Sequence, residues 1–94
     1  MKQGKLLNLK QIKKLKWADI VWIEIYVDKG AGHKLRMSEP SVVIRSDETV
    51  FCVSVESCAT DDQCVDVDGL SDDTLTEFYF EDCILKFYRM KKRK

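Results

Sequence analysis

The fold is decided by the stretch D-I-V-W-I-E-I-Y-V-D, residues 19–28, in which the character of the side chains alternates. Successive side chains of a β-strand point to opposite faces of the sheet, so a period of two predicts a strand. Four branched aliphatic side chains share one face: Val21, Ile23, Ile25 and Val27. Ile20, Trp22, Glu24 and Tyr26 fall on the other face. We therefore expect a central strand with one face in the hydrophobic core.

Turn-forming residues connect this strand to the next β run. Gly30 and Gly32 can adopt the positive φ values of a tight connection, so residues 33–37 are expected to return along 19–28 as a hairpin. Pro40 has no N–H to donate to a ladder. It predicts a bend or a sheet edge at that point.

Two more hairpins are expected further along the chain. Runs 42–45 and 49–56 are rich in β-branched residues and are joined by polar turn residues. Residues 64–68 alternate valine with polar side chains, which favours an edge strand with a charged outer face. Residues 74–80 follow a good helix-start sequence, but we favour a strand there because F-Y-F could pair with residues 83–90.

The segment before residue 19 predicts a short amphipathic helix. Asn8 can cap it, and the apolar side chains of Leu9, Ile12 and Leu15 recur on one side. Together the elements predict one small, mainly β (α+β) domain over residues 1–94. We expect a strongly bent antiparallel sheet or an SH3-like barrel of five to six strands with this short N-terminal helix, and a mobile basic tail at 91–94.

Charge is segregated along the chain although the formal net charge is zero. Residues 1–37 carry nine Lys or Arg and three acids, for +6; residues 38–82 carry one Arg and thirteen acids, for −12; residues 83–94 carry six bases, for +6. If the two ends pair in space, they form one basic patch. If they do not pair, attraction between the ends and the middle helps the chain to compact.

The stretch C-A-T-D-D-Q-C-V-D-V-D-G-L-S-D-D, residues 58–73, is either a metal site or a solvated acidic loop, and we favour the loop. The cysteines (Cys52, Cys58, Cys64 and Cys83) do not form the closely spaced pairs of a zinc site. With Gly69 at the sixth position, the EF-hand pattern puts Cys64 first and Leu75 twelfth, and so fails at both ends. A looser cation site among the aspartates stays open, but we expect no cofactor or metal.

Catalysis and membrane insertion have little support in the sequence. His33, the single histidine, has no recognisable nucleophile beside it, and neither phosphate-binding glycine motif is present. Lysines interrupt residues 1–16, so no secretory signal is expected, and the longest apolar run is too short to span a bilayer. We expect a cytoplasmic protein without enzymatic activity, in which the cysteines are thiols.

Two binding functions fit this pattern. The first is a small non-enzymatic module that acts on a protein partner through a charged surface, with six candidate acids: Asp61, Asp62, Asp66, Asp68, Asp72 and Asp73. The alternative is a nucleic-acid-binding domain that uses the two basic ends, with seven candidate residues: Lys10, Lys13, Lys14, Lys16, Lys91, Lys92 and Arg93. Trp17, Trp22 and Tyr88 would add aromatic surface for base stacking.

Overall fold

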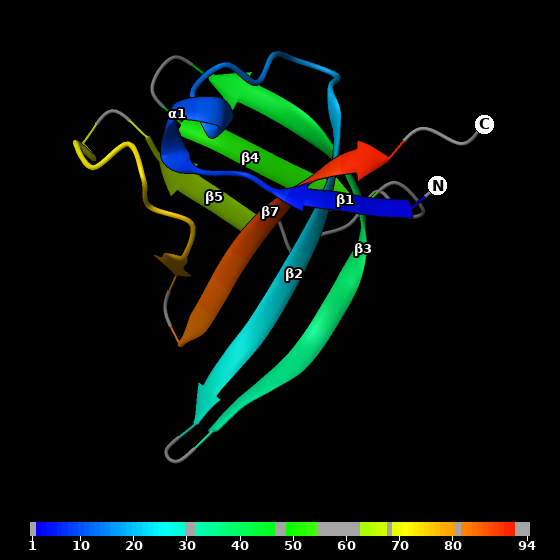
Figure 1. The fold of residues 1–94 in the computed structure, drawn as a ribbon, viewed down its shortest axis with the longest axis vertical. Helices are drawn as coiled ribbons and strands as arrows, with labels where there is room; N and C mark the ends of the chain where they lie inside the picture. The colour runs from blue at the N-terminus through cyan, green and yellow to red at the C-terminus, as the bar shows by residue number, and fades with distance from the viewer. Residues whose placement is uncertain are drawn as a thin grey trace.

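A computed structural model of the chain describes residues 2–29, 32–46, 49–54, 63–67, 69–80 and 82–91. In chain order its elements are β1 (Lys2–Leu6), α1 (Leu9–Ile12), β2 (Ile20–Lys29), β3 (Gly32–Ser46), β4 (Thr49–Ser54), β5 (Gln63–Asp66), β6 (Phe78–Phe80) and β7 (Cys83–Lys91). All seven of these strands belong to one antiparallel sheet in the order β1-β7-β2-β3-β4-β5, with β6 also paired to β7. The sheet curls strongly into a half-barrel (Figure 1). The predicted fold class, a strongly bent antiparallel sheet with a short N-terminal helix, is confirmed.

The strand count exceeds the expected five to six because β1 was not predicted. K-Q-G-K-L has no alternation of apolar and polar side chains, and β1 forms only by pairing with β7 at the other end of the chain. β3 runs through Pro40 as one strand, and Pro40 lies just outside the β3–β4 ladder, in agreement with the expected sheet edge. β4 pairs only with Ser41–Ser46, so its ladder begins after Pro40 and does not need the missing N–H.

The predicted hairpins are present. β2 pairs with β3 from Lys29 and Gly32 onward, and β6 pairs with β7 from Phe80 and Cys83 onward. In residues 74–80, however, only Phe78–Phe80 forms a strand. The Asp72 carboxylate accepts hydrogen bonds from the backbone N–H of Thr74 (3.0 Å) and its hydroxyl (2.6 Å), which holds the preceding residues in a turn.

The inner face of the curled sheet holds the core. Val21, Ile23 and Ile25 are buried as predicted, and the rings of Phe78 and Phe87 pack edge to face with their centres 5.8 Å apart. Val27 is only half-buried, because it pairs with the first residue of β7 where β2 leaves the sheet centre. The alternation thus identified the core face, but not where the core ends.

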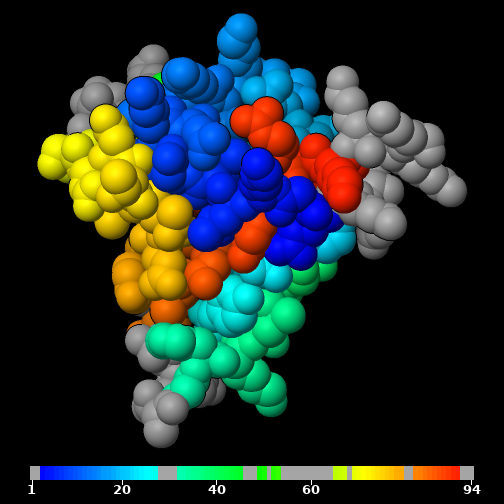
Figure 2. All heavy atoms as spheres, viewed as in Figure 1, coloured from blue at the N-terminus to red at the C-terminus, as the bar shows by residue number. Residues whose placement is uncertain are grey.

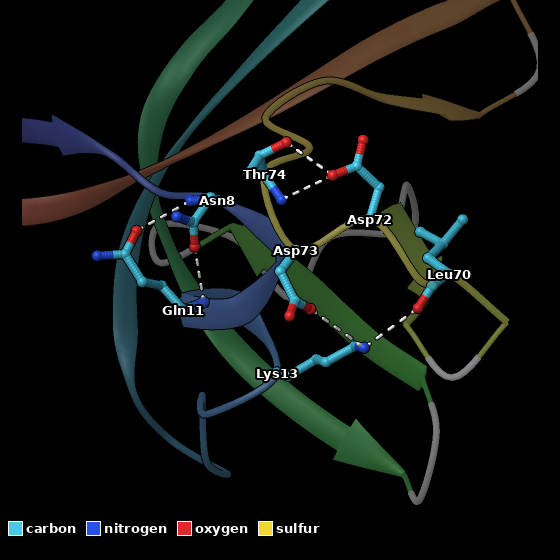
Figure 3. Close-up of polar contacts among 7 residues, drawn as sticks. All are labelled: Asn8, Gln11, Lys13, Leu70, Asp72, Asp73 and Thr74. Atoms are coloured by element: carbon cyan, nitrogen blue, oxygen red, sulfur yellow. Dashed lines mark hydrogen bonds and ion pairs between the residues drawn. The ribbon is translucent and has the colours of Figure 1, made fainter.

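Helix α1 packs onto this core but is shorter than expected. Leu9 and Ile12 are fully buried, and Asn8 caps the helix: its side chain accepts from the N–H of Gln11 (3.0 Å), and the Gln11 side chain accepts from the N–H of Asn8 (2.9 Å). The helix has four residues, so Leu15 of the expected apolar side lies beyond its end. The N–H of Leu9 donates to the carbonyl of Leu75 (2.7 Å), so the segment before β6 lies against the helix start (Figure 3).

Among the described residues, no helix is long and apolar enough to cross a membrane.

Gly4 marks the close approach of β1 to β7. The β1–β7 register shifts between Gln3 and Leu6, and a Cβ atom on Gly4 would lie 2.5 Å from the carbonyl oxygen of Arg89. We expect Gly4→Ala to lower the free energy of unfolding by about 1–3 kcal/mol in urea denaturation, because one of the two backbones must shift. Gly32→Ala is the matched control, since no atom lies within 4 Å of its added Cβ, and it should change stability by less than about 1 kcal/mol. Equal stability of Gly4→Ala and wild type would contradict this packing.

Candidate nucleic-acid interface

The pairing of β1 with β7 brings the two basic ends of the chain together. Lys2 lies opposite Lys91 and Gln3 opposite Met90 in the antiparallel register. In Figure 2 the N-terminal segment and the end of β7 form one continuous surface. The structure therefore places the two ends of the chain side by side in the sheet.

A groove of about 450 Å³ opens beside this pairing, between the C-terminal end of α1, the start of β2 and the end of β7. Its lining residues are Leu7, Gln11, Lys14, Leu15, Asp19, Ile20, Val21, Arg89 and Met90. The exposed side chains of Lys14 and Arg89 give it two positive charges. The carboxylate of Asp19 accepts a hydrogen bond from the N–H of Lys16 (2.8 Å), so it serves the local turn. Lys16 and Lys91 are exposed next to lining residues in the sequence, and Lys5 is exposed on β1, which pairs with β7.

The four predicted helix lysines do not act as one set. Lys14 lines the groove, and Lys10 and Lys16 are exposed. Lys13 points elsewhere: its Nζ donates to the carbonyl of Leu70 (3.1 Å) and lies 3.9 Å from the carboxylate of Asp73 (Figure 3). α1 ends at Ile12, and residues 70–75 pack along it. The lysines in and after the helix therefore face different neighbours.

An arginine on β3 fixes the end of α1. The guanidinium of Arg45 donates to the carbonyl of Lys13 and to the carbonyl of Leu15 (3.0 Å). These hydrogen bonds hold the backbone on either side of Lys14, one of the residues that line the groove.

In the C-terminal part of the predicted set, Lys91 is exposed at the end of β7, within the sheet rather than in a tail. Lys92 and Arg93 lie outside the described residues. Sequence reasoning missed Arg89 as a groove residue. Arg89 lies two residues after Phe87 and four after Leu85, so it is on the same, inner face of β7. Because β7 extends beyond the core at this end, the Arg89 side chain lines the groove.

A second groove, of about 400 Å³, lies between β5 and β6. It is lined by Val65, Asp66, Leu70, Leu75, Glu77, Phe78 and Tyr79. Of the predicted acidic set, Asp66, Asp72 and Asp73 are exposed on or near it, and Asp61, Asp62 and Asp68 lie outside the described residues. Asp73 lies beside Lys13, so part of the acidic stretch contacts the basic segment at the end of α1.

The outer face of β2 carries a buried carboxylate that the sequence did not single out. Glu24 is 9% exposed, and its Oε1 accepts from the hydroxyls of Tyr26 (2.9 Å) and Tyr88 (2.5 Å). Burial alone would raise the pKa of Glu24, but hydrogen bonds from Tyr88, Tyr26 and Gln3 and the charge of Lys86 outweigh it and hold the pKa below 4.5. Burial and the bond to Glu24 raise the pKa of both tyrosines above 10.

The directions of these pKa shifts favour a structural role for Glu24, Tyr26 and Tyr88. A general acid or base works best with a pKa near the working pH, and all three groups are shifted away from neutrality. The cluster is therefore suited to bracing β2 against β7.

The buried thiol of Cys52 is poorly placed for chemistry. Burial raises the pKa of Cys52 to about 12, so its reactive thiolate is scarce at neutral pH. Cys83 is a half-buried free thiol, and Cys58 lies outside the described residues. Within the part of the chain that the structure describes, no three His, Cys, Asp or Glu side chains gather closely enough to hold a metal ion.

Comparison with known protein families, curated proteins and solved structures finds no match to this chain. The two grooves are therefore the features of the molecule that bear on its function.

The Glu24 network should make stability depend on pH in the acid range. Because the pKa of Glu24 is lowered on folding, its contribution is present above about pH 4.5 and is lost as the pH falls through the folded-state pKa. We expect Glu24→Gln to lower the free energy of unfolding at pH 7 by about 1–3 kcal/mol, because hydrogen bonds to a charged group are weakened. The difference from wild type should shrink toward pH 3 in urea denaturation.

Glu77→Gln is the matched control for this experiment. Glu77 also faces Lys86, with its Oε1 3.6 Å from Nζ, but its side chain is 47% exposed. An exposed pair of this kind contributes about 0–1 kcal/mol. If the Glu24→Gln and Glu77→Gln variants lose equal stability at pH 7, the buried network is not the stabilising element that we describe.

Proposed function

We propose that the protein is a non-enzymatic binding module of the cytoplasm that holds a nucleic-acid strand along the groove between α1 and the end of β7. The observation that carries this proposal is the convergence of basic side chains from both ends of the chain on one groove, with Lys14 from one end and Arg89 from the other. Nucleic-acid phosphates attract such paired cations and release counterions when they bind.

The form of the groove supports a chain-like ligand. Beyond the groove-lining cations, Lys16 and Lys91 are exposed next to lining residues in the sequence, and Lys5 is exposed on β1, which pairs with β7. A ligand with repeated negative charges can contact several of them at once, whereas a small anion can contact only one or two. Ile20 and Met90 add apolar surface for sugars and bases.

A protein partner bound through the acidic surface is the second candidate. It is supported by the groove between β5 and β6, where apolar side chains are bordered by Asp66 and Glu77 and where Tyr79 is 70% exposed. A basic segment with apolar side chains would complement this surface. Glu77 already has a cation nearby, Lys86, whereas the first groove has more exposed cations than acids. The nucleic-acid proposal therefore comes first.

The test is an electrophoretic mobility shift with a labelled 20-nucleotide DNA or RNA of mixed sequence. Wild type should shift both at low salt. With about three phosphate contacts, a tenfold rise in salt should weaken binding roughly 100-fold. The double variant Lys14→Glu/Arg89→Glu should lose at least about tenfold in affinity, because two attractive contacts become repulsive.

The matched control changes the same number of charges elsewhere. Lys34→Glu/Arg36→Glu alters two exposed basic residues on the β2–β3 hairpin, away from α1 (Figure 1). It should bind within about threefold of wild type. Equal losses in the two double variants would show attraction to overall charge only, and the absence of a shift at any salt concentration would reject nucleic acid as the ligand.

A further inference from the structure

We propose that Trp17 is a platform on which one unpaired base stacks, so that the groove takes single-stranded rather than duplex nucleic acid. This inference rests on the proposed function and adds the class of strand. Its starting point is exposure: Trp17 is 67% exposed, although tryptophan is normally among the most extensively buried residues of a domain.

The turn that carries Trp17 is closed by hydrogen bonds at both ends. The N–H of Asp19 donates to the carbonyl of Lys16 (3.1 Å), and the N–H of Lys16 donates to the Asp19 carboxylate (2.8 Å). Trp17 and Ala18 occupy the two central positions. Ala18 has φ of 73°, a value that favours glycine and that an alanine adopts only when its surroundings enforce it.

The surroundings that enforce this conformation belong to the sheet. The N–H of Ala18 donates to the carbonyl of Val43 (2.8 Å), and the N–H of Val43 donates to the carbonyl of Asp19 (2.8 Å). Val43 is fully buried in β3. The turn is thus attached to the core, and the backbone that presents the indole is ordered before any ligand arrives, which reduces the entropic cost of binding.

The turn that carries Trp17 adjoins the groove, although Trp17 itself is not one of the lining residues. Leu15 and Asp19, two residues to either side of Trp17, both line it, so the Cα of Trp17 lies within about 8 Å of each of theirs. Lys16 and Ile20, exposed beside the same turn, supply a cation and an apolar surface. A base stacked on Trp17 would leave its phosphates near Lys14 and Lys16.

The other two aromatic candidates are already engaged. The indole N–H of Trp22 donates to the hydroxyl of Ser38 (2.8 Å), and the hydroxyl of Tyr88 donates to Glu24. Both side chains are half-buried on the outer face of the sheet. Trp17 therefore has the most accessible ring of the three. Because duplex bases are already stacked on one another, only an unpaired base can use it along a strand.

The experiment compares a 12-nucleotide oligo(dT) with a 12-base-pair duplex, by fluorescence anisotropy of labelled strands at low salt. Trp17→Ala should weaken binding of the single strand about 5- to 150-fold, whereas Trp17→Phe should keep most of the affinity. Binding of the duplex, which uses phosphate contacts alone, should change less than about threefold in both variants. The urea midpoint of Trp17→Ala should match wild type, since an exposed ring contributes little to packing.

Tryptophan emission provides a second, direct readout. Trp22→Phe leaves Trp17 as the sole tryptophan, and oligo(dT) should quench its emission. Trp17→Phe leaves only Trp22, whose emission should change little.

The outcomes separate the two proposals. If wild type binds neither strand, the proposed function fails, and this inference fails with it. If wild type binds but Trp17→Ala affects both strands equally or neither, and Trp17 emission is unchanged, the groove binds nucleic acid without a stacking platform. Loss confined to the single strand, with quenching of Trp17, is the result that supports the inference.

Discussion

The pairing of β1 with β7 is the contact on which the rest of the structure depends. It joins residues nearly a full chain length apart, so it is formed at a considerable loop-closure cost. It also joins two strands, β1 and β7, that carry lysine and arginine residues and no acids, and like charges repel one another. The gain that offsets these costs lies next to it: the N–H of Leu7 donates to the carbonyl of Phe87 (2.8 Å), and both side chains are buried. The burial of Leu7 and Phe87 thus holds together two basic segments of the chain that would otherwise repel each other.

The parts of the fold that sequence could predict are those with a local signal. Alternation over 19–28 identified β2 and its inner face, and the capping residue Asn8 identified the start of α1. β1 has no such signal, since K-Q-G-K-L becomes a strand only because β7 offers it an edge. The path through Pro40 is likewise decided by tertiary structure, because it depends on where β4 begins to pair. Local sequence patterns therefore predict individual helices and strands, whereas the pairing of distant strands depends on the tertiary structure.

The candidate site shows the same division. Charge segregation along the chain predicted basic ends that could merge, and β1–β7 pairing brings them together. Which cations reach the groove could not be predicted, because that depends on the helix ending at Ile12 and on residues 70–75 drawing Lys13 away. Arg89 was missed for a related reason: an inward position on a strand becomes a groove position once the strand extends beyond the core. Trp17 was a candidate by residue type, and its exposure follows from a turn held by Val43, far away in sequence.

Electrical neutrality of the whole chain does not argue against an anionic ligand. The molecule measures 38 × 28 × 26 Å, whereas charges exposed to solvent are screened over about 10 Å at 0.1 M salt. A strand in the groove therefore responds mainly to the side chains beside it: Lys14, Lys16 and Arg89, with Asp19 engaged in its turn. Neutrality has a different consequence, because it removes the long-range attraction that speeds encounter with a polyanion. Nucleic-acid binding as proposed here would therefore depend on local contacts and on the exposed ring of Trp17, and not on net charge.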